Sequence, residues 1–263
     1  MASSEASGST IKYLMMGAIL EIKAISFDFW NTLFKEQPGG FRLYQERRLR
    51  LLREVVRAQG DITDAELERA CSLEAESHYH IWIDEHRTLT ATERVTKILD
   101  ILAIRLLDDV TAQIANAFEE GILEYPPVLV EGAGEVIEHL ARHYNLGIIS
   151  DVGFSPGRVL KSVLDQAGLL ECFDSLVFSD EAGRSKPHRE VFERTARSLG
   201  AHPAEIVHIG DLEHTDIKGA KMAGYRAIRF SGVTPMDEEE TTIADRVTSD
   251  FYELPRLIES LEL

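Results

Sequence analysis

Residues 22–33, with the sequence IKAISFDFWNTL, decide how the rest of the chain can be arranged. The first half is an apolar run rich in β-branched and aromatic residues, which predicts a short buried strand. This strand ends on a carboxylate, Asp28. Ligands of open α/β sheets bind outside the carboxyl ends of the strands. Asp28 is therefore a candidate for chemistry, although an Asp at a strand end can also simply cap the next turn.

Three later stretches place reactive side chains at comparable positions. An apolar strand ends on Ser150, a turn before a predicted helix holds Lys186, and a further apolar strand is followed by Asp211 and then Asp216. An acid, a hydroxyl, a lysine and an acidic pair thus all lie at strand ends or helix starts. The three stretches are NLGIISD (145–151), GRSKP (183–187) and IVHIGDLEHTD (206–216).

Helical and strand patterns alternate after residue 132, and this predicts a parallel sheet with helices on both faces. The expected helices cover 133–144, 157–170, 189–199 and 217–223, and they precede strands over 146–150, 175–179, 206–210 and 227–230. A last helix is expected over 251–263.

No strand pattern is visible between the first strand and this alternating region. Four helices are predicted there instead: one over 41–58, one from the Thr63 capping box to about His78, one opened by Thr90, and one over 109–123. We therefore predict an α/β core over 21–37 and 126–263, a helical domain over 38–125, and a disordered tail over 1–20.

The composition restricts the partners. The 263 residues contain 44% hydrophobic residues and carry a net charge of −17, which argues against binding to nucleic acid or to an anionic membrane surface. Cys71 and Cys172 lack metal-ligand spacing and are expected to be reduced thiols of a cytoplasmic protein. The apolar run over 13–22 is too short to span a membrane.

In this order and spacing, the four motifs resemble those of the haloacid dehalogenase (HAD) superfamily. The resemblance runs through nearly all of the chain from residue 22 onward. It implies a HAD-like, Rossmann-like core and places the helical insert where a type C1 cap sits. Such caps close over the core site and select the substrate, and closure also excludes water from the reaction.

The resemblance also implies roles for the core residues. Asp28 aligns with the nucleophile of the phosphate-transferring members, in which a carboxylate attacks phosphorus and forms an aspartyl-phosphate. Thr32 and Ser150 align with hydroxyls that orient the transferring group, and Lys186 with the cation that neutralises the charge.

A Mg²⁺ site is implied as well, since hard oxygen ligands and a phosphate partner suit this ion. Its ligands would be Asp28, the main-chain carbonyl of Trp30, Asp211 and Asp216.

The first motif departs from the phosphatase pattern at Trp30. Phosphatases of this family have a second Asp there, which protonates the leaving oxygen and later activates water. General acid–base help of this kind is worth about 10²–10⁴-fold in rate. The indole N–H is a donor only and cannot replace it. The resemblance therefore implies a phosphatase that obtains this help elsewhere or works at a reduced rate.

Two branches of the family also lack this acid. Haloacid dehalogenases have Tyr at the position of Trp30, but they use no metal, have no Asp at the position of Asp211, and have Tyr where this chain has Phe192. Phosphonoacetaldehyde hydrolases form a Schiff base with a cap lysine, and the interior of the predicted cap offers only Lys97, in mid-helix. A dehalogenase-like reaction stays the first alternative, and a weakly active or non-catalytic protein that binds a phosphorylated ligand stays the second.

The segment over 77–87, SHYHIWIDEHR, is predicted to lie between two helices of the cap. Its position loosely resembles the substrate-contacting cap loop of pyrimidine nucleotidase-like relatives. Histidine titrates near neutral pH and could replace the missing acid. The alternative is that the histidines lie on the surface and that the tryptophan packs inside the cap. The candidate substrate-binding residues are His78, His80 and Trp82, together with Asn31 and Asp151.

The sequence thus predicts a Mg²⁺-dependent hydrolase of a small phosphorylated metabolite. Neither the substrate nor the oligomeric state follows from the sequence.

Overall fold

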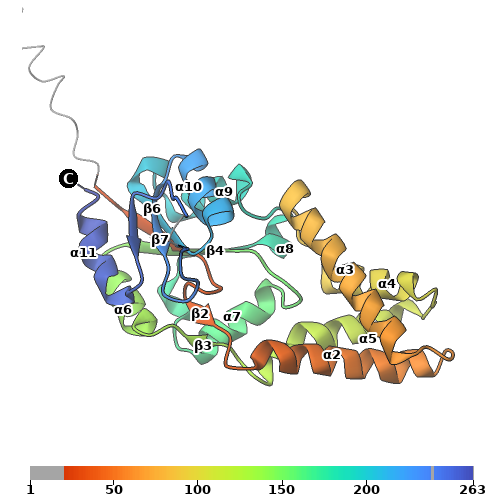
Figure 1. Cartoon of the computed structure of the whole chain (residues 1–263). Helices are drawn as coiled ribbons and strands as arrows, with labels where there is room; N and C mark the ends of the chain where they lie inside the picture. The colour runs from red at the N-terminus through yellow and green to blue at the C-terminus, as the bar shows by residue number, and fades with distance from the viewer. Residues whose placement is uncertain (1–20, 238–239, 263) are drawn as a thin grey trace, which may run out of the picture.

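The computed structural model describes residues 21–237 and 240–262, so the predicted tail over 1–20 lies outside the described residues. A six-stranded sheet forms the centre of the α/β core, on the left in Figure 1, and every pair of neighbouring strands in it is parallel. In spatial order the strands are β5 (Ser175–Phe178), β4 (Asn145–Ser150), β1 (Ala24–Phe27), β6 (Ile206–Gly210), β7 (Arg226–Phe230) and β8 (Arg246–Thr248).

This architecture confirms the predicted α/β fold with a parallel sheet. Strand β8 was not predicted, because only Thr248 of its three residues is buried and no apolar pattern marks it. Strand β1 is buried along its whole length, as expected for a strand covered on both faces.

Helices cover both faces of the sheet. On one face α6 (Ala133–Leu140), α7 (Gly157–Gln166) and α11 (Leu254–Glu259) enclose a hydrophobic cluster that includes Phe27 and Ile148. On the other face α9 (Arg189–Leu199) and α10 (Lys218–Ala223) enclose a cluster that includes Ala24, Ile149 and Phe192. Shorter elements complete the core: α8 (Ser179–Ala182), the 3₁₀ turns η2 (Leu170–Cys172), η3 (Pro203–Glu205) and η5 (Phe251–Glu253), and the π-helical turn η4 (Glu213–Ile217).

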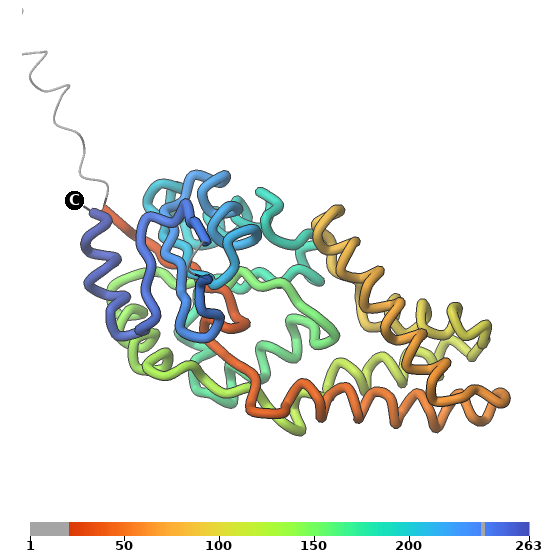
Figure 2. Tube along the Cα trace, in the orientation of Figure 1, coloured from red at the N-terminus to blue at the C-terminus, as the bar shows by residue number. Residues whose placement is uncertain are grey.

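Four helices form a second lobe beside the core. They are α2 (Gly40–Arg57), α3 (Asp64–Glu85), α4 (Ala91–Ile101) and α5 (Asp108–Glu119), and α5 continues into the 3₁₀ turn η1 (Glu120–Leu123). Figure 2 shows the chain leaving the core along α2 and returning along α5. The helices pack around their own hydrophobic cluster, which includes Leu52, Val95 and Phe118.

The two connections between the lobes pair with each other. Strand β2 (Phe34–Lys35) runs antiparallel to β3 (Val128–Leu129), with Phe34 opposite Leu129. The two crossings of the chain between core and helical lobe are therefore held together as one hinge.

The prediction that residues 77–87 lie between two helices is wrong. Helix α3 begins at the predicted Thr63 capping box but continues to Glu85, so residues 77–85 are helical. No Gly or Pro interrupts this stretch, and the helix ends only where His86 adopts a left-handed conformation with φ of 51°.

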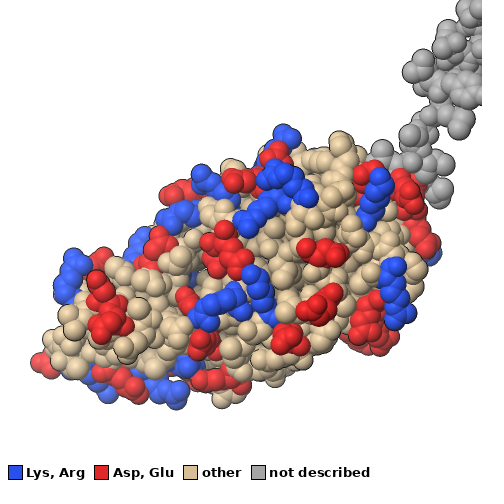
Figure 3. All heavy atoms as spheres, turned by 180° about the vertical axis from the view of Figure 1, so that it is seen from behind, with Lys and Arg blue, Asp and Glu red and all other residues tan. Residues whose placement is uncertain are grey.

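Acidic and basic side chains are interspersed on the face of the molecule shown in Figure 3. Within the described part of the chain, no helix is long and apolar enough to cross a membrane.

Candidate active site

The candidate site lies where three parallel strands end side by side. Strand β1 has β4 on one side and β6 on the other, with Phe27 opposite both Ile148 and Ile209. The Asp28 N–H extends this pairing by donating to the Ile209 carbonyl oxygen at 2.8 Å. The order of the strands reverses between β1 and β6, and such switch points are where open α/β sheets bind ligands. The register thus brings together Asp28, Ser150 at the end of β4, and Asp211 after β6.

Lys186 joins two of the carboxylates. Its Nζ lies 2.5 Å from Asp28 Oδ1 and 2.6 Å from Asp216 Oδ1. The whole group is buried, since Lys186 is 2% exposed, Asp28 5% and Asp216 1%. A buried charge is tolerated only when it is paired and hydrogen-bonded, and this arrangement satisfies the lysine with two opposite charges.

The cluster shifts the ionisation of its members in different directions. Burial raises the pKa of Asp28 well above its usual value, and the nearby Lys186 only partly offsets this effect. Burial acts on Asp216 in the same sense, but Lys186 and a hydrogen bond from His208 outweigh it and lower its pKa. Burial alone would lower the pKa of Lys186, yet Asp216 and Asp28 raise it above its usual value. Lys186 is therefore a permanent cation at neutral pH.

Three carboxylates of the site could hold a metal ion together. Asp28, Asp211 and Asp216 are all buried and each offers an oxygen within 4.8 Å of the others. Burial, followed by the charge of Asp216, raises the pKa of Asp211 to about 6. A divalent cation would relieve this repulsion, and an all-oxygen donor set suits Mg²⁺. The residues present therefore fit the metal that the sequence implies.

The three carboxylates are not equivalent. Asp216 already accepts hydrogen bonds at both oxygens, from Lys186 and more weakly from His208 at Oδ1, and from the Leu212 N–H at Oδ2. Asp211 accepts at Oδ2 from Thr234 at 2.9 Å. Asp216 is thus suited to supporting Lys186 as well as to contributing negative charge to the metal.

A second layer of side chains, which sequence reasoning missed, orients this cluster. His208 lies between Ser26 Oγ, at 2.9 Å from Nδ1, and Asp216 Oδ1, at 3.4 Å from Nε2. Phe192, the position where dehalogenases have Tyr, packs edge-on against His208 at 5.4 Å between ring centroids. Ser26 and His208 are buried polar residues within otherwise apolar strands, and this is the signal that could have identified them.

The two candidate hydroxyls, those of Thr32 and Ser150, are both buried near the end of β1. Thr32 Oγ1 has no hydrogen-bond partner among residues 21–237 and 240–262, so it is able to donate to a ligand. Ser150 Oγ lies 3.2 Å from the Asp151 carbonyl oxygen. Asn31 has a φ of 57°, a conformation that Asn tolerates in turns, so it shapes the bend that follows Asp28.

Trp30, in the loop that follows Asp28, lines a cavity of about 770 Å³ between the core and the helical lobe. Its ring packs edge-on against Phe29 at 5.2 Å between centroids. Trp30 thus forms part of a cavity wall, at the position where phosphatases have their second Asp.

Trp82 of α3 docks onto the core rather than packing inside the helical lobe. Its Nε1 donates to Asp151 Oδ2 at 2.8 Å, and its ring lies edge-on to His214 at 5.7 Å. The other oxygen of Asp151 accepts from the Lys186 backbone N–H at 2.9 Å. Asp151 therefore links the helical lobe to the backbone of the catalytic lysine candidate.

The two candidate histidines of α3, His78 and His80, lie in different surroundings. His78 lines the cavity, and burial, followed by the charges of Arg94 and Arg87, lowers its pKa to about 4. It is therefore neutral at pH 7 and able to accept a proton but not to supply one. His80 is exposed, with Nδ1 3.7 Å from Asp84, and it does not line the cavity.

A family model of haloacid dehalogenase-like hydrolases matches residues 22–224. Among curated proteins, the glyceraldehyde 3-phosphate phosphatase of Methanopyrus kandleri is 26% identical over 218 residues, which cover 80% of this chain and 84% of that protein. The phosphatase of the same name from Pyrococcus furiosus is 31% identical over 136 residues, and here the match spans only about half of each protein, 51% of this chain and 54% of the relative.

The structural comparison agrees on the fold. A 2-haloacid dehalogenase from Pseudomonas syringae pv. Tomato DC3000 matches with a TM-score of 0.69 and 22% identity, over 91% of this chain and 99% of that one. At this identity the likeness concerns the fold and not the reaction.

Proposed function

Because the chain belongs to the haloacid dehalogenase-like hydrolase family, we propose that it hydrolyses the phosphate ester of a small metabolite through attack by Asp28 on phosphorus. The observation that carries this proposal is the buried group of Asp28, Lys186, Asp211 and Asp216. The names of the two relatives, both phosphatases of a small phosphorylated metabolite, support it.

The first step is nucleophilic. The Asp28 carboxylate attacks phosphorus, the ester bond to the leaving oxygen breaks, and an acyl phosphate forms that water then hydrolyses. Lys186 holds Asp28 at 2.5 Å and places a fixed positive charge where negative charge develops. Thr32 and Ser150 are the hydroxyls that would orient the phosphoryl oxygens.

The proposed metal is Mg²⁺, held by Asp28 and Asp211 with the charge of Asp216 behind them and with the main-chain carbonyl of Trp30 as a further ligand. When bound, it would polarise the phosphoryl group and neutralise charge in the transition state. Lys186 already pairs with Asp28 and Asp216, so this second cation would balance the charge of Asp211.

Proton transfer to the leaving oxygen is the step for which the site is least equipped. Trp30 occupies the position of the usual acid, and His78 is neutral at pH 7 because its pKa is about 4. We therefore expect esters with good leaving groups to react fastest, and we assign His78 at most the acceptance of a proton from water.

The test uses p-nitrophenyl phosphate, whose leaving group needs no proton. Wild-type protein should release phosphate in Mg²⁺ and lose this activity in EDTA. Asp28→Asn should reduce turnover to background while retaining the fold, as judged by circular dichroism. Activity that survives either change would refute the proposal.

The dehalogenase-like alternative makes the opposite prediction, since halide release from a 2-haloacid would ignore EDTA. The acidic group formed by Asp28, Asp211 and Asp216 favours the phosphatase, because displacing halide from carbon needs no such charge density. A protein that only binds would be stabilised by a phosphorylated ligand without turnover. The predicted boundaries, a core over 21–37 and 126–263 and a cap over 38–125, belong to the same proposal, as does a cytoplasmic location.

A further inference from the structure

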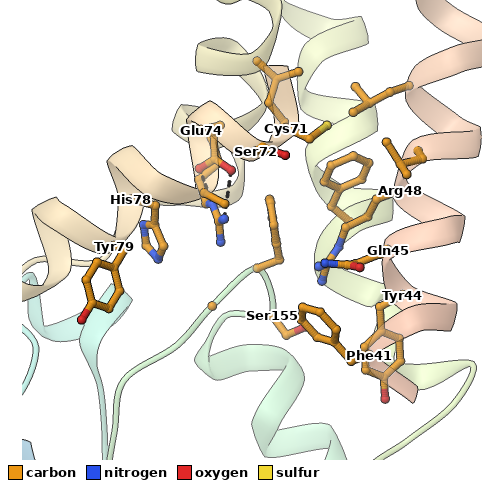
Figure 4. A pocket seen from close by; sticks show the side chains of 18 of the residues that line it. Phe41, Tyr44, Gln45, Arg48, Cys71, Ser72, Glu74, His78, Tyr79 and Ser155 are labelled. Carbon is orange, nitrogen blue, oxygen red and sulfur yellow. Dashed lines mark hydrogen bonds and ion pairs between the residues drawn. The ribbon is translucent and has the colours of Figure 1, made fainter. Parts of the chain in front are cut away.

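The cavity beside Trp30 contains polar groups that the proposed chemistry does not use. It lies between α2, α3 and the core loop that carries Phe154 and Ser155. Figure 4 shows Arg48 from α2, Glu74 from α3 and Ser155 from the core around the same space. Its volume of about 770 Å³ is within the range of sites that enclose most of a small-molecule ligand.

Two guanidinium groups lie against the same aromatic ring. The Cζ atoms of Arg48 and Arg94 are 4.1 Å and 3.5 Å from the centre of the Phe154 ring. Arg94 is neutralised by Glu74 through two buried contacts, Nε to Oε1 at 2.6 Å and Nη2 to Oε2 at 2.9 Å. For Arg48, no carboxylate within 4.0 Å and no hydrogen-bond acceptor occur in the described ranges 21–237 and 240–262.

Arg48 is thus a half-buried cation beside a second cation, and no described carboxylate lies within 4.0 Å of it. Glu36 lines the same cavity and acts on Arg48 only at longer range, where the charge of Arg48 partly offsets the rise that burial gives to the pKa of Glu36. Burial, followed by repulsion from Arg94, lowers its pKa to about 10, so it remains charged at neutral pH. The cavity also contains Ser155 Oγ and His78 Nδ1, two buried atoms for which the described residues provide no hydrogen-bond partner. Buried polar groups of native proteins normally have partners, and a ligand is one source of them.

The chemistry of the missing partner follows from these donors. The Phe154 ring lies on one side of the Arg48 guanidinium, and the N–H groups that point away from the ring can bind a planar or tetrahedral oxyanion. The Ser155 hydroxyl can donate a further hydrogen bond to the same oxyanion. Trp30 lines this cavity and follows Asp28 by two residues, so the cavity lies beside the loop that carries Asp28.

We propose that Arg48, with Ser155, binds a second acidic group on the alcohol portion of the substrate, either a carboxylate or a second phosphate. This inference rests on the proposed phosphatase function and makes Arg48 a residue that determines specificity. The preferred substrates are then phosphate esters that carry a further negative charge away from the ester.

The experiment compares matched pairs of esters. 3-Phosphoglycerate and glycerol 3-phosphate differ by a carboxylate, and fructose 1,6-bisphosphate and fructose 6-phosphate differ by a phosphate. We expect the wild type to favour the acidic member of at least one pair in kcat/KM. Arg48→Met should reduce that preference by about 10- to 100-fold, the usual worth of a hydrogen bond to a charged group. Arg48→Lys should retain part of it, and the pair that responds identifies the acidic group.

Arg50→Met is the matched control, because Arg50 lies on the same helix, is exposed and does not line the cavity. It should leave the preference unchanged. The inference is overturned if the wild type favours the acidic member of neither pair, or if Arg48→Met slows both members equally, which would indicate packing alone.

Failure of the proposed function would look different, since no ester, p-nitrophenyl phosphate included, would then be hydrolysed. In that case binding is measured directly, by calorimetric titration of wild type and Arg48→Met with 3-phosphoglycerate and fructose 1,6-bisphosphate. Binding that weakens at least tenfold in Arg48→Met would support the inference without turnover. Equal or absent binding in both proteins would refute it.

Discussion

Replacing Lys186 by Met tests whether this lysine holds the acidic cluster together. The substitution keeps most of the side-chain volume but removes the cation that pairs with Asp28 at 2.5 Å and with Asp216 at 2.6 Å. Removing one partner of a buried ion pair costs about 3–5 kcal/mol of unfolding free energy. For a chain of this size, about 2–4 °C of melting temperature corresponds to each kcal/mol. We therefore expect Tm to fall by about 6–20 °C at pH 8.

The decrease in Tm caused by Lys186→Met should depend on pH in a defined direction. Without the lysine, the folded-state pKa values of Asp28 and Asp216 lie above the unfolded value of about 4. The folded variant then binds more protons than the unfolded chain, and its stability falls as pH rises through this window. In the wild type Lys186 lowers the pKa of Asp216, which gives stability that is present above pH ~4 and lost below it. The difference in Tm should therefore shrink between pH 8 and pH 5.

The assay is thermal unfolding followed by circular dichroism in EDTA buffer, so that no metal replaces the lysine. Lys218→Met, at an exposed lysine of α10, is the control and should melt like the wild type. The double variant Lys186→Met/Asp28→Asn should recover part of the loss, because it removes one uncompensated carboxylate. A Tm of Lys186→Met close to that of the wild type at pH 8, or a deficit that is the same at pH 5, would refute the electrostatic reasoning.

Two further changes test the geometry around this cluster. Gly210→Ala would place a Cβ 2.4 Å from Asp216 Cγ, so Asp216 must move. We expect the unfolding free energy to fall by about 1–3 kcal/mol and kcat/KM to fall at least tenfold. In the control Gly60→Ala the new Cβ meets nothing within 4 Å, so neither quantity should change. Trp82→Phe keeps an aromatic ring but removes the 2.8 Å hydrogen bond to Asp151, and KM for p-nitrophenyl phosphate should rise about 3- to 10-fold. An unchanged KM would show that this bond does not help to hold the helical lobe against the core.

The core strands were predictable because burial on both faces makes them mostly apolar runs, as in 24–27 and 206–210, each of which contains a single polar side chain, Ser26 or His208. The grouping of Asp28, Ser150 and Asp211 was predictable because each of them lies at or directly after the end of a core strand. The end of α3 was not predictable in the same way, since the residues after His78 lack a clear apolar stripe and the ending depends on the backbone of His86.

The contacts that complete the site come from distant parts of the chain. Thr234 meets Asp211, and Arg94 meets Glu74, only because of how the loops and the helical lobe are placed. No local pattern marks such pairs, so the cavity and its charge balance could not be derived from the sequence. His80 is the opposite case, because its residue type suggested a substrate-binding role but its position on α3 leaves it exposed to solvent.

The pairing of β2 with β3 makes the helical lobe an exchangeable module. Phe34 lies opposite Leu129 and Lys35 opposite Val128, so the chain returns to the core beside the point at which it left. Neither β1 nor β4 needs the intervening residues in order to pair, since their register is fixed between residues 24–27 and 145–148. A lobe of another length or shape could be inserted at this junction without changing the pairing of β1 with β4, whereas the segment of Lys186 would lose the link that Trp82 makes to it through Asp151. If the lobe selects the substrate, as the proposed function holds, then substrate choice can diversify by insertion and replacement at one place in the gene while the strands that carry Asp28 and Ser150 are inherited unchanged.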